Sequence, residues 1–352
     1  MNVGVPKEIK PGEARVALSP AGARELTSRG HRVVVEAGAG AGSRIGDDDF
    51  QAAGAEIVPT AEDVFEQAEL IVKVKEPKPV ETQRLGPGHV LFTFLHLAAH
   101  PEAAKGLRAS GATAIAYETV QLPSGLTPLL APMSRIAGRM AAQVGARFLE
   151  QPQGGRGVLL CGAPGVPRAR ATVLGAGQAG ANAALGLAGL GAQVNVLDVD
   201  VDKLMRLAEL GQGNITTVHA SRLAVEEYVP GSDVVVGAVL TVGAATPVLV
   251  DEDLIRQMRP GAVVVDISID QGGTFETSHE TTHSEPVFVL HDVVHYAVGN
   301  IPGAVPHTST YALTNATLPY VLALADGLPS ALARRAELAT GVNVAGGAYT
   351  HP

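Results

Sequence analysis

A glycine-rich segment near the middle of the chain constrains its fold more than any other feature. It reads Val173-Leu-Gly175-Ala-Gly177-Gln-Ala-Gly180, and Val194-Asn-Val-Leu-Asp198 follows it. The pattern predicts a strand, a tight glycine turn, a helix and a second strand that ends in an acid. Such a unit belongs to a parallel α/β sheet, because the crossover helix returns the chain to the same edge of the sheet.

The three glycines have different predicted tasks. Gly175 permits the turn, Gly177 lets the backbone approach a pyrophosphate, and Gly180 lets the helix pack close to the strand. The start of the helix offers unpaired N–H groups and the positive end of its dipole to phosphates. Asp198 would accept hydrogen bonds from both hydroxyls of an adenosine ribose and would repel a 2′-phosphate, which predicts a dinucleotide site that prefers NAD to NADP. The alternative is a purely structural turn with Asp198 as a cap, since a chain with 41 glycines contains such strings by chance.

Length, charge and cysteine content limit the classes of protein to consider. The 352 residues suffice for two domains with substantial cores. A net charge of −9 argues against nucleic acid as a partner, because phosphate backbones bind basic surfaces. The single cysteine, Cys161, excludes an intrachain disulfide, fits a reducing compartment and is expected to be small and buried. No signal-peptide pattern or apolar run of ~20 residues is evident, so we expect a cytoplasmic protein without a membrane partner.

Short strands alternate with helices along the chain. Strands are expected at residues 3–6, 31–36, 56–58, 70–75, 90–95 and 112–116. A second series begins at Ala171 and continues with strands at residues 194–198, 234–236, 263–266 and 288–290. Apolar residues recur at helical spacing in residues 133–149, and residues 309–324 are also expected to be helical.

These elements predict an α/β protein with two doubly wound domains and an active-site cleft between them. Residues 1–131 and 306–352 would form a Rossmann-like substrate domain, and residues 132–305 would form a Rossmann NAD-binding domain. The two long helices would connect the domains.

Four charged or titratable residues lie at expected strand ends or in turns. Arg15 follows the first strand, Lys75 and His96 end two later strands, and Asp270 lies just past the strand at residues 263–266. Ligands of open α/β sheets bind outside the carboxyl ends of the strands. The four residues therefore suit a small anionic substrate that is enclosed between domains. Each residue could instead have a purely structural role. Arg15 could form a surface ion pair, and Lys75 could be a solvated lysine at a strand end. His96 could be a core histidine, and Asp270 could start a turn.

Several longer segments are more specific than a glycine fingerprint. They include Gly4-Val-Pro-Lys-Glu-Ile-Lys10, Val72-Lys-Val-Lys-Glu-Pro77, Leu91-Phe-Thr-Phe-Leu-His-Leu-Ala98 and Asn300-Ile-Pro-Gly-Ala-Val-Pro306. With these motifs, nearly the whole chain resembles the NAD-dependent alanine dehydrogenases of the alanine dehydrogenase/transhydrogenase family. The resemblance implies that L-alanine, NAD⁺ and water give pyruvate, ammonium and NADH, reversibly. It also implies a homo-oligomer, usually a homohexamer.

The resemblance assigns site residues as well. It implies that Arg15 and Lys75 contact the carboxylate and carbonyl of the substrate, that Met133 and Asn300 line the pocket, and that His96 and Asp270 transfer protons. How the last two divide their roles is left open. For the cofactor, the glycine turn at Gly175, Gly177 and Gly180 is joined by Ser134, Gln178, Ala179, Asp198, Lys203, Ser221, Val239, Leu240, Ile267, Ser268, Ile269, Asp270, Val298, Gly299, Asn300 and Ile301.

These residue types suit the implied chemistry. A guanidinium holds a carboxylate in bidentate fashion. A lysine beside a carbonyl stabilises the charge that develops on its oxygen. Addition of water to an iminium needs a base that titrates near neutral pH, which suits His96.

The chain departs from the family at several positions. Ala220 stands beside Ser221 where relatives often have Ser, Ala245 replaces a common Lys, and His279 replaces an Arg found in some relatives. Some relatives carry a Glu/His pair that can hold a metal, where this chain has Ala323 and Gly327, so we expect no metal.

Three alternative functions stay open. The chain could be the cofactor-binding subunit of a proton-translocating transhydrogenase, which would need a membrane partner. It could be a catalytically silent NAD sensor or assembly protein. It could also be an opine- or lysine-forming dehydrogenase, whose larger substrates would need a roomier pocket.

Overall fold

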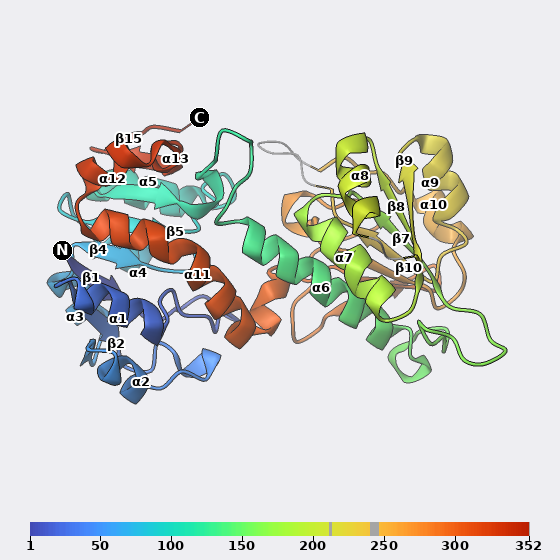
Figure 1. Cartoon of the computed structure of the whole chain (residues 1–352), viewed down its shortest axis with the longest axis horizontal. Coiled ribbons are helices and arrows are strands. Elements are labelled where there is room, and N and C mark those ends of the chain that lie inside the picture. The colour runs from blue at the N-terminus through green and yellow to red at the C-terminus, as the bar shows by residue number, and fades with distance from the viewer. Residues whose placement is uncertain (211–212, 240–245, 352) are drawn as a thin grey trace. The chain divides into compact units, whose positions relative to one another are not determined.

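The computed structural model describes residues 1–210, 213–239 and 246–351, and the chain forms two compact units (Figure 1). Unit 1 comprises Met1–Met133 and Val305–Pro352, and unit 2 comprises Ser134–Ala304. Each unit contains one sheet with helices on both of its faces, so the predicted α/β class with two Rossmann-like domains is confirmed. The substrate and cofactor roles of the two domains stay predictions. None of the described helices is long and apolar enough to cross a membrane.

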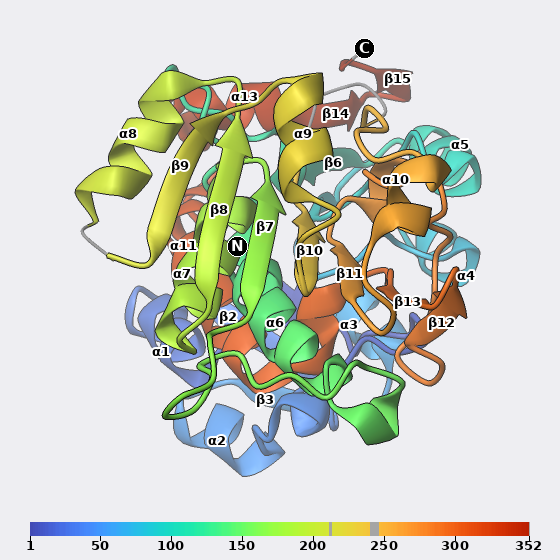
Figure 2. The same cartoon turned by 90° about the vertical axis from the view of Figure 1, so that its right-hand side faces the viewer.

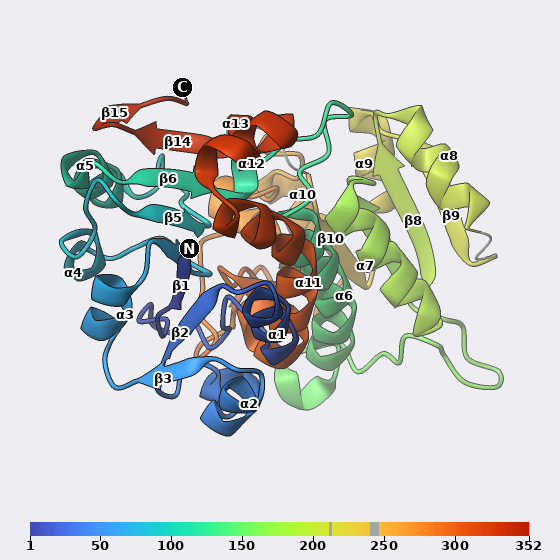
Figure 3. The ribbon, with the colours of Figure 1, turned by 60° about the vertical axis from the view of Figure 1, so that its left-hand side comes forward.

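The sheet of unit 1 has the strand order β15-β14-β6-β5-β4-β1-β2-β3 (Figure 3). Strands β1 to β6 pair in parallel, whereas β14 is antiparallel to β6, and β15 to β14. The bounds are β1 Asn2–Val5, β2 Arg32–Glu36, β3 Glu56–Val58, β4 Leu70–Val72, β5 Val90–Thr93, β6 Thr113–Ala116, β14 Val342–Ala345 and β15 Ala348–Tyr349. The last two strands were not predicted, because each is short and lies among glycines.

Helices cover both faces of this sheet, with α3 and α5 on one side and α1 and α11 on the other (Figure 3). Local side chains set the starts of two of these helices: the Ser19 hydroxyl caps α1, and Thr60 and Asp63 form a capping box on α3. The bounds are α1 Pro20–Ser28, α2 Asp47–Ala52, α3 Ala61–Gln67, α4 Pro79–Thr82, α5 Pro101–Ser110, α11 Pro306–Ala325, α12 Leu328–Arg334 and α13 Ala336–Gly341.

The sheet of unit 2 has the strand order β12-β13-β11-β10-β7-β8-β9 (Figure 2). All neighbours pair in parallel except β12, which forms an antiparallel hairpin with β13. The strands are β7 Arg170–Leu174, β8 Gln193–Asp198, β9 Ile215–His219, β10 Val234–Gly237, β11 Val263–Asp266, β12 Val287–Leu290 and β13 Val293–Tyr296. The helices are α6 Ala131–Phe148, α7 Gln178–Gly189, α8 Val201–Glu209, α9 Arg222–Tyr228 and α10 Glu252–Gln257.

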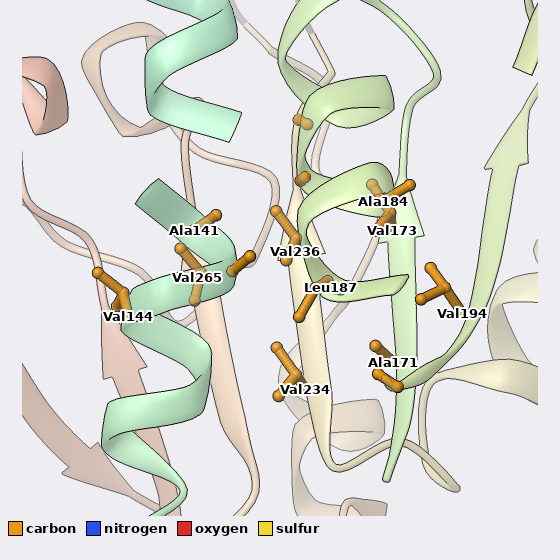
Figure 4. Packing of buried hydrophobic residues seen from close by; sticks show 14 of the residues in the cluster. Ala141, Val144, Ala171, Val173, Ala184, Leu187, Val194, Val234, Val236 and Val265 are labelled. Atoms are coloured by element: carbon orange, nitrogen blue, oxygen red, sulfur yellow. The ribbon is translucent and has the colours of Figure 1, made fainter. Parts of the chain in front are cut away.

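The core of unit 2 follows from the alternation of side chains along its strands. Val234 and Val236 of β10 pack in a cluster that includes α6 and α7, whereas Val235 between them packs with α9 and α10. Figure 4 shows the first cluster, in which Ala141 and Leu187 reach the sheet from the two helices. A strand that is apolar on both faces must be covered on both sides, which explains the continuous valine runs.

Two predicted strands end earlier than expected, at Val72 and Thr93, so Lys75 and His96 lie in the loops beyond them. The backbone N–H of Val74 donates to the Glu8 carboxylate in the loop after β4. Cys161 is also exposed rather than buried, because it lies in a surface loop of unit 2 between α6 and β7.

Candidate functional site

Arg15, Lys75 and His96 follow three neighbouring strands of unit 1. These strands are β1, β4 and β5, which pair in parallel in the order β5-β4-β1. The carboxyl ends of parallel neighbours lie along the same edge of a sheet, where open α/β folds bind their ligands. The fold of unit 1 therefore places the three residues after the carboxyl edge of one sheet.

Arg15 is buried, with 2% of its surface exposed, rather than part of a surface ion pair. Its Nε donates to Oε1 of Glu13 at 2.7 Å, and its Nη2 pairs with Oε2. Burial would raise the pKa of Glu13, but the Arg15 hydrogen bonds and the charge of Lys75 lower it to about 2, so Glu13 is ionised. A second carboxylate held in bidentate fashion by Arg15 must use the Nη1–Nη2 edge, and Nη1 lies 3.0 Å from Sδ of Met133.

The two lysines after β4 have different surroundings, and neither is a solvated lysine. Lys73 is buried between Glu8, at 3.2 Å, and Glu81, at 2.7 Å. Burial alone would lower the pKa of Lys73, but these carboxylates raise it above its usual value. Lys75 is 8% exposed, and its charge acts on Glu13. Lys73 is therefore an internal counter-ion, whereas Lys75 places a charge beside the Glu13–Arg15 pair.

His96 has an unusual backbone, with a left-handed φ of 45°. The Glu118 carboxylate accepts the backbone N–H groups of Leu95 and His96, and its Oε1 lies 3.8 Å from Nδ1 of the imidazole. The ring stacks on Phe94 with a centroid distance of 5.7 Å. Because 38% of the side chain is exposed, His96 is not a core histidine. Its loop conformation and its ring are both held by neighbouring groups.

Sequence reasoning gave no role to Glu13 or Glu118. The signals were present but weak: Glu13 lies two residues before Arg15, and Glu118 follows β6, the neighbour of β5. Only the folded chain shows that Glu13 contacts Arg15 and that Glu118 contacts His96.

The glycine turn of unit 2 has the geometry of a phosphate-binding loop. Gly175 has a left-handed φ of 102°. A Cβ on Gly180 would lie 1.8 Å from the carbonyl oxygen of Gly175, so the helix and the turn are in backbone contact. A Cβ on Gly177 would meet nothing within 4 Å, and α7 begins at the next residue, Gln178, without a side-chain cap. The turn therefore places open space beside the first backbone N–H groups of α7, which have no carbonyl partner within the helix.

Asp198 ends β8 and braces this turn. Its Oδ2 accepts the N–H of Ala176 at 2.6 Å, and its Oδ1 accepts the N–H of Asp200 at 2.8 Å. A carboxylate has about four acceptor positions, so these two bonds leave capacity on each oxygen for a ribose hydroxyl. The capping role and the predicted ribose role are compatible.

The other predicted cofactor residues gather at the carboxyl edge of the same sheet. Val239 follows β10, residues 267–270 follow β11, and residues 298–301 follow β13. The Ser268 hydroxyl donates to the Val239 carbonyl at 2.7 Å. A Cβ on Gly299 would lie 2.1 Å from Oε1 of Glu280 and 3.1 Å from Oδ1 of Asp270, so Gly299 lies close to both carboxylates.

Some predicted residues make local contacts or lie outside the described residues. Lys203 is exposed and pairs with Asp200 at 3.3 Å, and the Ser221 hydroxyl caps α9. His279 stacks on Phe288 at 3.8 Å. Leu240 and Ala245 lie outside the described residues. Within the described ranges, no group of three or more His, Cys, Asp or Glu residues could hold a metal ion.

Comparison with known families completes this description. Residues 4–137 match the N-terminal domain of the alanine dehydrogenase/PNT family, and residues 141–352 match its C-terminal domain. The chain belongs to this family.

Individual relatives give the same result. An alanine dehydrogenase of Halomonas elongata is 55% identical over 352 residues, which cover 100% of this chain and 95% of that protein. A solved L-alanine dehydrogenase structure is 48% identical with a TM-score of 0.97, over 100% of this chain and 97% of that chain. A transhydrogenase structure from Sinorhizobium meliloti is 28% identical with a TM-score of 0.85, over 100% and 99% of the two chains. The predicted family and enzyme class are thereby confirmed.

Proposed function

We propose that this family member is an NAD-dependent alanine dehydrogenase that converts L-alanine reversibly to pyruvate and ammonium. The observation that carries the proposal is the placement of Arg15, Lys75 and His96 after three neighbouring parallel strands, so that all three follow the carboxyl edge of one sheet. A chain that bound only a dinucleotide would have no need for a buried guanidinium and a buried lysine after that edge.

The glycine turn and Asp198 suit NAD. Gly177 has room for a pyrophosphate against the backbone, and the first amides of α7 suit its charge. The carboxylate of Asp198 would accept the ribose hydroxyls and disfavour a 2′-phosphate. Ser134, Val239, Leu240 and the two segments at residues 267–270 and 298–301 complete the proposed cofactor site. When bound, NAD⁺ accepts the hydride from the α-carbon of alanine.

Unit 1 would bind the amino or keto acid. Arg15 holds the carboxylate through its outer edge, because Glu13 occupies the Nε–Nη2 edge. Lys75 stabilises negative charge on the carbonyl oxygen of pyruvate. Met133, whose sulfur contacts Arg15, and Asn300 of unit 2 would line the substrate pocket.

Proton transfer would fall to His96 and Asp270. Loss of hydride from the neutral amine of alanine leaves an iminium, and water adds to its carbon to give a carbinolamine. The carbinolamine expels ammonia, and its hydroxyl proton passes to the ammonia, so that pyruvate and ammonium result. Water addition requires removal of a proton, and expulsion of ammonia requires its return to nitrogen. His96, held by Glu118 and partly exposed, suits the base that takes and returns this proton. Asp270 would hold the ammonium or act as a second acid/base.

We also propose that the protein works in the cytoplasm as a homohexamer, with small-molecule substrates and without nucleic acid or membrane partners. Sedimentation equilibrium would test the hexamer, and a monomer or dimer at working concentration would contradict it.

NADH absorbance in the presence of pyruvate and ammonium tests the function. Loss of absorbance should require both substrates, and the product should be L-alanine. NADPH should be a much poorer donor. His96→Ala is the matched control: it should abolish turnover while NADH binding persists.

A transhydrogenase-like role is the second candidate, because the transhydrogenase structure covers the whole of this chain. NADH binding without oxidation in the presence of both substrates would favour that role. Oxidation that depends on both substrates would exclude it as the main activity.

A further inference from the structure

Helices α6 and α7 lie side by side in unit 2, and their turns lie in register. The Arg135 Nε donates to Oε1 of Gln178 at 2.8 Å, and the Arg139 Nε donates to Oδ1 of Asn182 at 3.0 Å. Both pairs join residues 43 positions apart, so one turn of α6 matches one turn of α7. The two helices are therefore parallel, and Arg135 lies beside the first residue of α7.

Close backbone contact fixes this register. A Cβ on Gly138 would lie 2.1 Å from the carbonyl oxygen of Ala179, and a Cβ on Gly186 would lie 2.8 Å from Cβ of Ala142. Helices that touch through glycine cannot slide without a clash. Arg135, one turn before Gly138, is thus held beside the start of α7 by packing as well as by its hydrogen bond.

Arg135 is an exposed arginine beside the first residue of α7. In the part of the chain that the structure describes, its hydrogen-bond partner is an amide, and no carboxylate lies within ion-pair distance. The guanidinium has five N–H donors, and Nε accounts for one. Its charge adds to the positive end of the α7 dipole, next to the open space at Gly177.

We propose that Arg135 is a further cofactor-binding residue, which holds Gln178 at the glycine turn and places its charge beside the pyrophosphate of the dinucleotide. The inference rests on the dinucleotide site proposed above. Arg139 makes the same type of contact four residues later, about 6 Å farther along the helix, and should not share this role.

Calorimetric titration of the full-length protein with ADP and with adenosine tests the proposal, because only ADP carries a pyrophosphate. Arg135→Met should weaken ADP binding about fivefold and leave adenosine binding unchanged. Arg135→Lys should retain most of the ADP affinity, since it keeps the charge. Arg139→Met is the matched control and should change neither affinity by more than about twofold.

Salt dependence provides a second measurement. The affinity of the wild type for ADP should fall more steeply with rising salt than that of Arg135→Met, because an exposed charge pair is screened. Equal ADP affinity in Arg135→Met and wild type would overturn the inference alone. An equal loss for ADP and adenosine would also overturn it, since that pattern indicates a disturbed fold. A wild-type protein that binds neither NADH nor ADP would overturn the proposed dinucleotide site with it.

Discussion

At the scale of single residues, neighbouring carboxylates orient the basic side chains of unit 1 or neutralise their charge. Glu13 takes one edge of Arg15 and is itself kept ionised, and Glu8 and Glu81 neutralise Lys73. An arginine whose inner edge is already bonded is oriented before a substrate arrives, which reduces the entropy lost on binding. Glu118 likewise orients His96, because its carboxylate accepts the backbone N–H of His96 and lies close to the imidazole ring.

We predict that Glu118→Gln will lower kcat/KM for pyruvate about tenfold while the protein stays folded. Glutamine keeps an acceptor for the Leu95 and His96 amides but removes the negative charge near the imidazole. Glu118→Ala should lose more activity and some thermal stability, because two backbone donors lose their partner. Steady-state kinetics and thermal melting of both variants provide the check. Wild-type kinetics in Glu118→Gln would show that the charge has no part in catalysis.

At the scale of elements, the β7–turn–α7 unit separates two reasons for glycine. Gly180 is needed because α7 touches the turn, and Gly177 because space is left beside it. The φ of Gly177 is −69°, which any residue adopts, so backbone conformation does not require glycine there. One glycine therefore supports the fold, and the other leaves room for a ligand.

The two alanine variants should therefore behave differently. Gly180→Ala should lower the melting temperature, because its Cβ would lie 1.8 Å from a carbonyl oxygen; we expect a cost of about 1–3 kcal/mol. Gly177→Ala should melt like the wild type but bind NADH about tenfold more weakly, because the methyl group occupies the space proposed for the pyrophosphate. Thermal melting and NADH fluorescence titration measure the two effects. Unchanged NADH affinity in Gly177→Ala would place the pyrophosphate elsewhere.

At the scale of the whole molecule, the candidate residues divide between two units that each have their own sheet and core. Arg15, Lys75 and His96 belong to unit 1, whereas the glycine turn and Asp198 belong to unit 2. A change in one core should disturb the other little, because each unit packs its own sheet and core. Substrate and cofactor affinity should therefore respond to separate substitutions.

This division predicts opposite kinetic patterns for two variants. Arg15→Lys should raise the KM for pyruvate at least about tenfold and leave the Kd of NADH unchanged. A lysine cannot form the bidentate hydrogen bonds that arginine makes to a carboxylate. Asp198→Asn should raise the Kd of NADH and reduce the preference for NADH over NADPH, with a smaller effect on the KM for pyruvate. Asparagine keeps one acceptor oxygen for the turn, and circular dichroism should confirm the fold. A Kd for NADH that rises equally in both variants would contradict separate binding regions.

Much of the fold was predictable because its signals are local. Local residues set the bounds of α5, Pro101–Ser110, because Pro101 starts the helix and Gly111 ends it in a left-handed conformation. Strands β9, β13, β14 and β15 were not predicted. They lie at or beside sheet edges, where backbone pairing with a neighbouring strand rather than a long apolar run defines the strand.

The sequence by itself determined the alternation of strands and helices, the glycine turn, the acid at Asp198 and the family, because each depends on neighbouring residues or on a linear pattern. Only the tertiary structure decided that Arg15 is bonded to Glu13, that Lys73 is an internal counter-ion, and that Glu118 holds His96. It also placed Arg135 against Gln178, 43 residues away. All of these contacts except the Arg15–Glu13 pair, which lies within one loop, join groups from different elements. Strand order and helix register bring those groups together, and no linear spacing encodes their distances.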